Sequence, residues 1–324
     1  MKRQLLSLLA CGTLAACVDA PTQHSATDLP GASASYDRVV VVSLGGVRGD
    51  AVAGMPELQK MLGSAVWTDS MLTVVPSRKV PTQLALMSGR DVPALGITTD
   101  DGEAASRVML DDGITTLFNW VHAAGPGITA AVASSSYLDP SIRVSAQNIL
   151  GIDTLNATSL DGGDVVTAAI ALWGGAAAPR LLMVHLADAD LAGHDVGWIS
   201  SDTLADSVAD VLTPAYLKAA LHVDSALARL RAALDPSIAA GTTALVIVGD
   251  HGGGHGIGCE SGVSAAKNHC TSYSGDVLIP FVLVGKGLTP ARLPRGARLT
   301  QVAATAAKLL GVAPSASAAV PLDY

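Results

Sequence analysis

The chain has 324 residues with a formal net charge of −8, and 49% of its residues are apolar. An acidic chain offers no basic face for nucleic acid, and an aromatic share of only 3% argues against stacking platforms for bases. Nucleic acid is therefore excluded as a partner. The apolar content is sufficient for the core of one large domain or of two small ones.

The N-terminal segment, residues 1–17, is predicted to be a signal peptide. It begins with Lys2 and Arg3 and continues with an apolar run over 5–14, which is too short for a permanent membrane helix. Its ending, Leu-Ala-Ala-Cys17, resembles a bacterial lipoprotein cleavage site, at which the cysteine becomes lipidated. An ordinary secretory signal is the alternative. We therefore expect an exported protein that is held to a membrane by a lipid anchor on Cys17.

Residues 18–36 are rich in Ser, Ala, Pro and Thr and are predicted to be a flexible tether to a single domain over 37–324. The expected location is the periplasm or cell envelope. Val18 stands where an aspartate retains some lipoproteins at the inner membrane, so the outer membrane is favoured for a Gram-negative source.

Two cysteines, Cys259 and Cys270, remain within the domain and lie in one polar loop. In an oxidising compartment, a disulfide that closes this loop is the simplest interpretation. Zinc ligation by the two thiols is the alternative, although their spacing matches no zinc-ribbon pattern.

Apolar, strand-like runs alternate with helical segments along the domain. Strands are expected at 38–44, 127–133, 180–186, 243–249 and 277–284, and helices at 55–62, 82–88, 115–124, 164–173, 214–234 and 300–310. This alternation predicts an α/β domain around a largely parallel sheet. The segment 139–164 is the least regular and is a candidate cap over the site.

Two short blocks pair a carboxylate with an imidazole. Asp190 and His194 form one block, Asp250 and His251 form the other, and each block follows an apolar run. Ligands collect at the carboxyl ends of parallel strands, and carboxylate and neutral imidazole are zinc-type ligands. Either block alone could be a strand-end turn with a polar cap. Together they predict one metal site.

These blocks resemble the alkaline phosphatase superfamily, most closely its type I phosphodiesterase and nucleotide pyrophosphatase branch, over residues 38–313. The segments 279–285 and 299–311 are similar to the last strand and the C-terminal helix of that family. The resemblance implies an alkaline-phosphatase-like three-layer α/β/α domain. It also implies a phosphodiester or phosphomonoester hydrolase that uses one or two zinc ions, or another divalent metal, on a small-molecule or lipid phosphate ester.

The resemblance also assigns the ligands. Asp190 and His194 would hold the first metal ion with one further histidine, and Asp250 and His251 would hold the second. His269 and His255 are both candidates for the further histidine. His269 is favoured, because its distance from the following strand suits the family pattern, and His255 would then be a loop residue only.

Two departures from the family pattern concern the second metal ion and the nucleophile. The family's first strand ends in Asp-Gly, whereas Gly45 stands at that ligand position here. The spacing to Pro81 and to the Ser-Gly-Arg run at 88–90 places Lys79 at the position of the attacking residue. An ammonium group cannot attack as an alkoxide. We therefore expect Lys79 to occupy the second-metal position and to pair with Asp250.

Three interpretations of function remain open. The first is a metal-dependent phosphoric ester hydrolase with an altered site, in which Ser77, Thr82 or a metal-bound water replaces the nucleophile. The second is a catalytically inactive pseudoenzyme that binds an anionic envelope ligand, to which Arg78 and Lys79 are suited. The third is a structural lipoprotein whose Asp and His side chains satisfy strand ends.

Overall fold

The computed structural model describes residues 35–136, 149–200 and 210–324. The predicted signal peptide, Cys17 and nearly all of the tether lie outside these residues. Among the helices in the described ranges, none is long and apolar enough to cross a membrane.

One sheet of eight strands organises the domain, in the order β4-β3-β5-β1-β6-β7-β2-β8. The strands are β1 (Arg38–Leu44), β2 (Val66–Leu72), β3 (Thr129–Ser134), β4 (Thr154–Ser159), β5 (Leu181–Leu186), β6 (Thr243–Gly249), β7 (Leu278–Val284) and β8 (Ala291–Arg292). The five strands from β4 to β6 are mutually parallel, whereas β7 runs antiparallel to both β6 and β2. The predicted α/β domain with a largely parallel sheet is confirmed.

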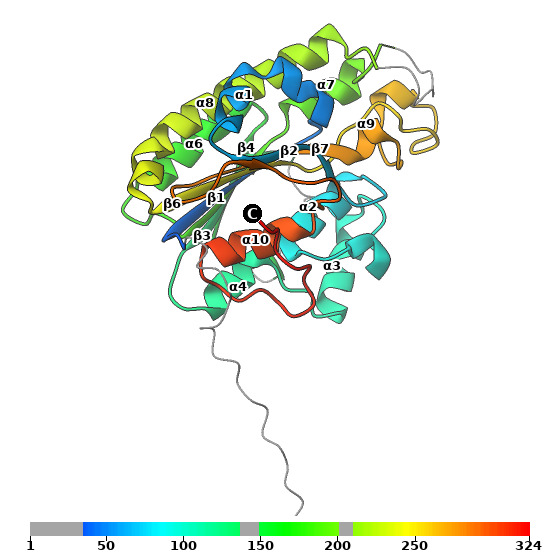
Figure 1. The fold of residues 1–324 in the computed structure, drawn as a ribbon. Helices are drawn as coiled ribbons and strands as arrows, with labels where there is room; N and C mark the ends of the chain where they lie inside the picture. Colours follow the sequence, from blue (N-terminus) through cyan, green and yellow to red (C-terminus); the bar gives the residue numbers. More distant parts are fainter. Residues whose placement is uncertain (1–34, 137–148, 201–209) are drawn as a thin grey trace, which may run out of the picture. The chain divides into compact units, whose positions relative to one another are not determined.

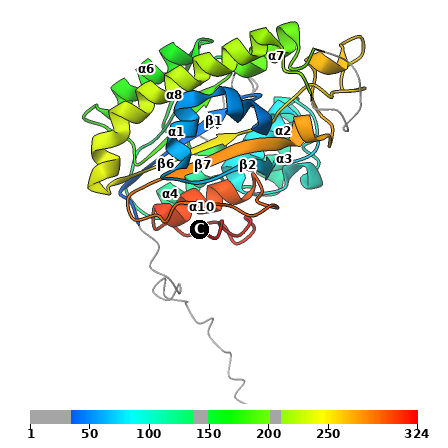
Figure 2. The same ribbon diagram turned by 45° about the horizontal axis from the view of Figure 1, so that its top comes forward.

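Helices cover both faces of the sheet, as Figures 1 and 2 show. The helices are α1 (Pro56–Leu62), α2 (Lys79–Ser88), α3 (Gly102–Asp111), α4 (Leu117–Ala123), α6 (Gly162–Trp173), α7 (Asp188–Val196), α8 (Pro214–Ala240), α9 (Ser274–Val277) and α10 (Gln301–Leu309). The face with α1, α6, α7 and α8 is opposite to the face with α2, α3, α4 and α10. The layers are therefore α/β/α.

The central strand β1 shows why the sheet is buried on both sides. Its Val39 and Val41 belong to the apolar core that includes α4 and α10, and its Val40 and Val42 belong to the core that includes α6 and α8. Successive side chains of a strand point to opposite faces, so a strand covered on both faces is a continuous apolar run. This pattern made β1, β5, β6 and β7 visible in the sequence.

The second part of the candidate cap at 139–164 is instead part of the sheet. Residues 154–159 form β4, which pairs in parallel with β3, and α6 begins at Gly162. This strand lies at the edge of the sheet and has a mixed polar sequence, so it lacks the apolar run of a central strand. Residues 137–148 lie outside the described part of the chain.

The long helix α8 also organises the start of the domain. The carboxylate of Asp224 accepts the backbone N–H groups of Glu57 and Leu58, each at 2.8 Å, and so caps the first turn of α1.

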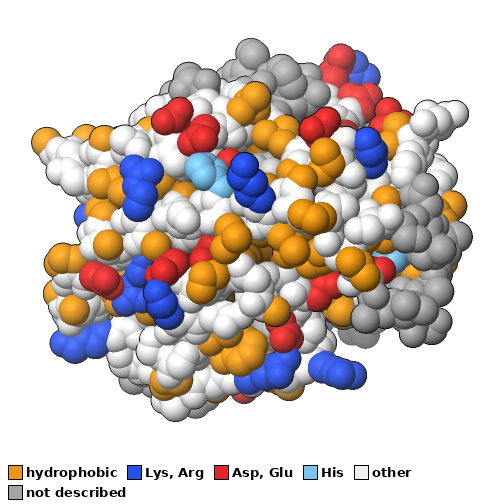
Figure 3. Space-filling view, turned by 90° about the horizontal axis from the view of Figure 1, so that it is seen from above, with side chains coloured by type: hydrophobic (Ala, Val, Ile, Leu, Met, Phe, Trp, Pro, Cys, Tyr) orange, Lys and Arg blue, Asp and Glu red, His pale blue; other side chains and the backbone are white. Residues whose placement is uncertain are grey.

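On the surface formed by α1, α6, α7 and α8, acidic and basic side chains are interspersed (Figure 3).

Candidate metal centre

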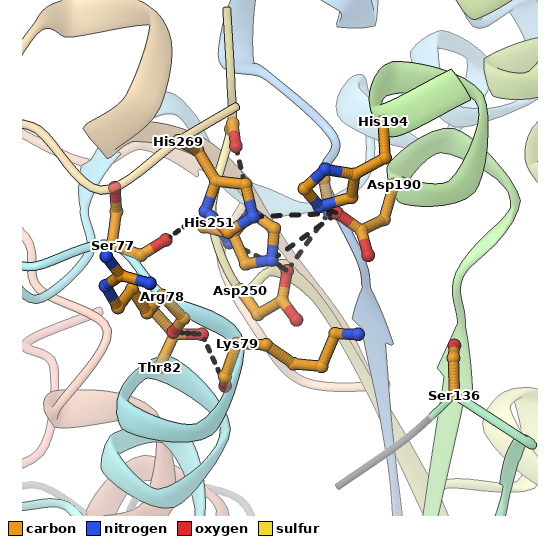
Figure 4. Close-up of polar contacts among 12 residues, drawn as sticks. Ser77, Arg78, Lys79, Thr82, Ser136, Asp190, His194, Asp250, His251 and His269 are labelled. Atoms are coloured by element: carbon orange, nitrogen blue, oxygen red, sulfur yellow. Dashed lines mark hydrogen bonds and ion pairs between the residues drawn. The ribbon is translucent and has the colours of Figure 1, made fainter. Parts of the chain in front are cut away.

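The two Asp/His blocks meet at the carboxyl ends of β5 and β6. Asp190 and His194 lie on α7, which follows β5, whereas Asp250 and His251 begin the loop after β6. His269 enters from the loop before α9, and the side chains point toward one another (Figure 4). Strand order explains this meeting, because β5 and β6 both flank β1.

Three imidazoles surround a single carboxylate oxygen of Asp190, whose side chain is buried. The distances from Asp190 Oδ1 to the Nε2 atoms are 3.4 Å for His194, 3.8 Å for His251 and 3.9 Å for His269. The side chain of His194 is 39% exposed, whereas those of His251 and His269 are buried. The centre is therefore reached from solvent on the His194 side.

Each of these rings is oriented by a backbone carbonyl at its other nitrogen. Nδ1 faces the carbonyl oxygen of Lys267 in His194 (3.0 Å), of Gly252 in His251 (2.8 Å) and of Ser77 in His269. Because a carbonyl only accepts, Nδ1 carries the proton of each neutral ring. Nε2 then presents a lone pair to the carboxylate of Asp190, and such an arrangement of backbone-oriented histidines is typical of metal ligands.

Several polar atoms of the centre have no hydrogen-bond partner. Asp190 Oδ1, Asp250 Oδ2 and His251 Nε2 are buried and have no hydrogen-bond partner among the described residues. Single ligand atoms of Asp190, His251 and His269 also lie within 4.8 Å of one another. Leaving buried polar groups unpaired is costly, and a bound cation would satisfy all of these atoms. The donor set of imidazole nitrogens and carboxylate oxygens fits zinc or a similar divalent ion.

The electrostatics of the centre keep Asp190 ionised. Burial acts to raise its pKa, but the neighbouring His251, His194 and His269 lower that pKa to about 2. Burial acts to lower the pKa of His251, but the carboxylates of Asp250 and Asp190 raise it above the usual value. Burial, together with His251, holds the pKa of His269 well below the usual value.

Asp250 is oriented by the end of β1 rather than by Lys79. Its Oδ1 accepts the backbone N–H groups of Gly46 (3.2 Å) and His251 (2.7 Å). Lys79 is the first residue of α2, and its side chain extends toward the carboxylates (Figure 4). Both residues are described, and no ion pair joins them. The expected Lys79–Asp250 pair is therefore not formed, and the backbone donors hold only Oδ1 of this carboxylate.

The two alternative nucleophiles are turned toward backbone carbonyls. The buried hydroxyl of Ser77 faces the carbonyl of Thr271 at 3.4 Å. Thr82 donates within its own helix, at 2.9 Å from the carbonyl oxygen of Arg78 and 3.0 Å from that of Lys79. Neither hydroxyl is directed at Asp190, so neither is placed for attack.

His255 lies away from the other histidines. Its Nε2 is 3.4 Å from Asp210 Oδ1, and its ring is tilted against Tyr273 with centroids 5.5 Å apart. Asp210 also pairs with Arg48, which fixes this separate polar cluster. The structure therefore brings His269 rather than His255 to Asp190.

The loop that carries His269 is held by a cross-link and by a carboxylate. Cys259 and Cys270 form a disulfide, with Cα atoms 5.8 Å apart. Asp276 Oδ2 accepts the backbone N–H groups of Cys270 (3.1 Å) and Thr271 (3.0 Å). These contacts begin at the residue after His269, so they restrict where its ring can lie.

Trp198 is a buried residue that sequence reasoning missed. Its Nε1 donates to the carbonyl of Gly46 at 2.8 Å, and its ring packs against the rings of His194 and His269. A β-carbon at Gly193 would lie only 2.2 Å from Trp198 Cε2, so the glycine of the first block is required by packing. No pattern along the chain indicates such a contact.

His185 is the second residue that sequence reasoning missed. It lies on β5, is buried, and its Nδ1 is 3.1 Å from Ser43 Oγ on β1. Burial lowers its pKa to about 4, although the carboxylates of Asp250 and Asp190 act in the opposite direction. A polar residue within an apolar run was the available signal.

Comparison with family models matches residues 39–269 to the type I phosphodiesterase / nucleotide pyrophosphatase family. Comparison with curated protein sequences finds no significant match. One similar solved structure is an inactive variant of murine ectonucleotide pyrophosphatase / phosphodiesterase 5 in complex with AMP, with TM-score 0.62, 13% identity, and 86% of this chain and 96% of that chain covered.

Two bacterial structures are also similar. Lipoteichoic acid synthase LtaP from Listeria monocytogenes has TM-score 0.61 and 13% identity, over 87% of this chain and 74% of that chain. A protein in the alkaline phosphatase superfamily from Vibrio parahaemolyticus has TM-score 0.59 and 15% identity, over 89% of this chain and 71% of that chain. At these identities the likeness establishes the alkaline-phosphatase-like fold.

Proposed function

Because the chain belongs to the type I phosphodiesterase / nucleotide pyrophosphatase family, we propose that it is a metal-dependent hydrolase of phosphoric esters with an altered nucleophile position. The observation that carries this proposal is the convergence of three backbone-oriented imidazoles on Oδ1 of Asp190, which has no hydrogen-bond partner among the described residues. Fold membership alone would not distinguish an enzyme from an inactive relative.

Asp190, His194, His251 and His269 would hold the ion, with Asp250 at the edge of the set. A divalent ion bound there supplies positive charge for the phosphoryl group in the transition state. Asp190 stays ionised because its pKa is lowered to about 2 by the surrounding histidines, against the effect of burial. The half-exposed His194 marks the side from which an ester would enter.

Lys79, at the expected position of the nucleophile, decides which group can attack the ester. Its ammonium group stands at the start of α2 and is directed into the centre (Figure 4), where it can contact the phosphoryl oxygens of an ester. The hydroxyls of Ser77 and Thr82 face carbonyls instead. We infer that water is the attacking group, so that the P–O bond to the leaving alcohol breaks without a phosphorylated side chain.

We also propose that the protein is exported and lipid-anchored at Cys17 in the cell envelope, with the outer membrane favoured. The Leu-Ala-Ala-Cys17 ending supports export, and the Cys259–Cys270 disulfide is typical of an oxidising compartment. The proposed substrate class is a small-molecule or lipid phosphate ester. Similar structures include one in complex with AMP and one named as a lipoteichoic acid synthase.

A catalytically inactive pseudoenzyme that binds an anionic envelope ligand is the second candidate. The specific observation in its favour is Lys79 at the expected nucleophile position, next to Arg78, which donates to the Cys259 carbonyl at 2.7 Å. A cation fixed at that point favours anion binding and does not itself attack phosphorus.

The test measures metal content and hydrolysis in parallel on the full chain, purified in detergent without chelators. We expect bound zinc or a similar ion by mass spectrometry, and slow hydrolysis of bis-p-nitrophenyl phosphate or p-nitrophenyl phosphate. Asp190→Asn should lose both. Metal without hydrolysis of either ester would favour the pseudoenzyme, and a chain that binds no divalent ion would leave only the structural interpretation.

A further inference from the structure

Three neighbouring strands end at the metal centre, but only the outer two contribute carboxylates. The strands β5, β1 and β6 are adjacent, and Asp190 follows β5 while Asp250 follows β6. The middle strand, β1, ends at Leu44 and is followed by Gly45, which has no side chain. A carboxylate at position 45 would complete a row of three.

The imidazole of His185 packs tightly against the place where a side chain at position 45 would begin. A β-carbon on Gly45 would lie 3.1 Å from His185 Cε1 and 3.2 Å from His185 Nε2, with the carbonyl oxygen of Leu186 at 3.3 Å. These contacts are tight for a single carbon atom. Even a β-carbon at position 45 would therefore press the ring by a few tenths of an ångström, and protein interiors leave little free space for larger groups.

The ring is held in this place by the strand pairing. His185 and Ser43 are register partners on β5 and β1, and Ser43 Oγ lies 3.1 Å from His185 Nδ1. The N–H of Gly45 donates to the carbonyl of Leu186 at 2.8 Å, which keeps the two strand ends together. His185 is 2% exposed and Ser43 is fully buried, so the ring cannot swing into solvent.

The space between Gly45 and His185 lies next to Asp250 at the metal centre. The next residue, Gly46, donates its N–H to Asp250 Oδ1 at 3.2 Å, whereas the buried Asp250 Oδ2 has no hydrogen-bond partner in the described part of the chain. A two-metal hydrolase needs separate ligands for two ions about 4 Å apart. Without a side chain at position 45, Asp250 and His251 are the candidates for a second ion among the described residues, and His251 is shared with Asp190.

We propose that His185 fills the place of a missing third carboxylate and thereby limits the centre to a single divalent ion. This inference rests on the proposed metal-dependent function and specifies its stoichiometry. The side chain of His185 on β5 then takes up volume next to Gly45, the residue after β1 that has no side chain.

The experiment compares Gly45→Asp, His185→Ala and the double variant with the unchanged full chain. Metal per folded chain is counted by mass spectrometry after zinc loading, and Mn²⁺ electron paramagnetic resonance reports spin coupling between neighbouring ions. We expect one ion in the unchanged chain and in each single variant. The double variant should bind a second ion and show coupling. His122→Ala, on α4, is the matched control and should bind one ion.

Several outcomes would overturn the inference while leaving the function intact: two coupled ions in the unchanged chain, a second ion in Gly45→Asp alone, or no second ion in the folded double variant. Loss of the single ion in His185→Ala would make His185 a ligand, which also contradicts its role as filler. A chain without any ion would instead defeat the proposed function. If the double variant fails to fold by circular dichroism, Gly45→Asp with His185→Ser is counted in its place.

Discussion

The imidazole rings of His251 and His269 stack face to face, with centroids 3.9 Å apart and planes 12° from parallel. Both lie in the connection between β6 and α9, and both direct Nε2 at Asp190 Oδ1. Two rings at this distance would repel each other if both were charged. The pKa values of the two rings are shifted in opposite directions. Burial and His251 lower the pKa of His269, whereas Asp250 and Asp190 raise the pKa of His251 against its burial.

Metal affinity should therefore depend on pH through one of these two rings. His251, with its raised pKa, binds a proton that a metal ion must displace, whereas His269 stays neutral. Below the pKa of His251, the zinc dissociation constant should rise about tenfold for each pH unit. Competition titration against a chromophoric chelator, corrected for the chelator's own protonation, measures the slope. If the logarithm of the dissociation constant changed with pH as expected for two protons released by this pair, His269 would not be neutral.

Replacing Lys79 should strengthen metal binding. Its charge lies close enough to Asp190 to contribute to the lowered pKa of that carboxyl, so it also repels a cation bound there. We expect Lys79→Met and Lys79→Thr each to tighten zinc binding by about tenfold, from the loss of one nearby charge. Isothermal titration of the metal-free protein checks this.

Comparing the two Lys79 variants also distinguishes the effect of losing the positive charge from the effect of adding a hydroxyl nucleophile. Only Lys79→Thr places a hydroxyl at the start of α2, where it is directed at the centre. If the position is competent for attack, hydrolysis should rise in the Thr variant and not in the Met variant. Equal rates in both would show that a hydroxyl at this position is not activated.

Gly193→Ala should destabilise the protein and weaken the metal centre. The added carbon would lie 2.2 Å from Trp198 Cε2, so the buried indole and the rings that pack on it must shift. Overpacking of this kind costs about 1–3 kcal/mol. Urea unfolding and zinc titration measure the two effects. Gly63→Ala is the control, because its added carbon meets no atom within 4 Å; equal losses in both variants would argue against the Trp198 clash.

Asp224→Ala should destabilise the domain from a position outside the centre. The carboxylate accepts two backbone N–H groups at the start of α1, and removing it leaves both without an acceptor. We expect a loss of about 1–3 kcal/mol in urea unfolding. Asp235→Ala on the same helix removes the ion pair between the half-exposed Asp235 and the partly buried Arg231, and it should cost less than Asp224→Ala. Similar costs for both would contradict the capping role.

The expected pairing of Lys79 with Asp250 shows where sequence reasoning reached its limit. The spacing to Pro81 placed Lys79 at the position of the attacking residue, and the structure has its side chain extending toward the carboxylates from the first residue of α2. The error concerned Asp250, whose Oδ1 is already held by the N–H groups of Gly46 and His251. Those donors depend on how the end of β1 meets the loop after β6, and no local pattern contains that information.

The sequence by itself determined the α/β class, five of the buried strands and the family, because buried strands are largely apolar runs and the Asp/His blocks follow two of them. It also identified the residues that meet at the centre. Only the tertiary structure decided that Trp198 packs on Gly193 and that His185 fills the space beside Gly45. The physical reason is that strand order and register bring together residues far apart in the chain, and steric fit between them is a property of three-dimensional packing.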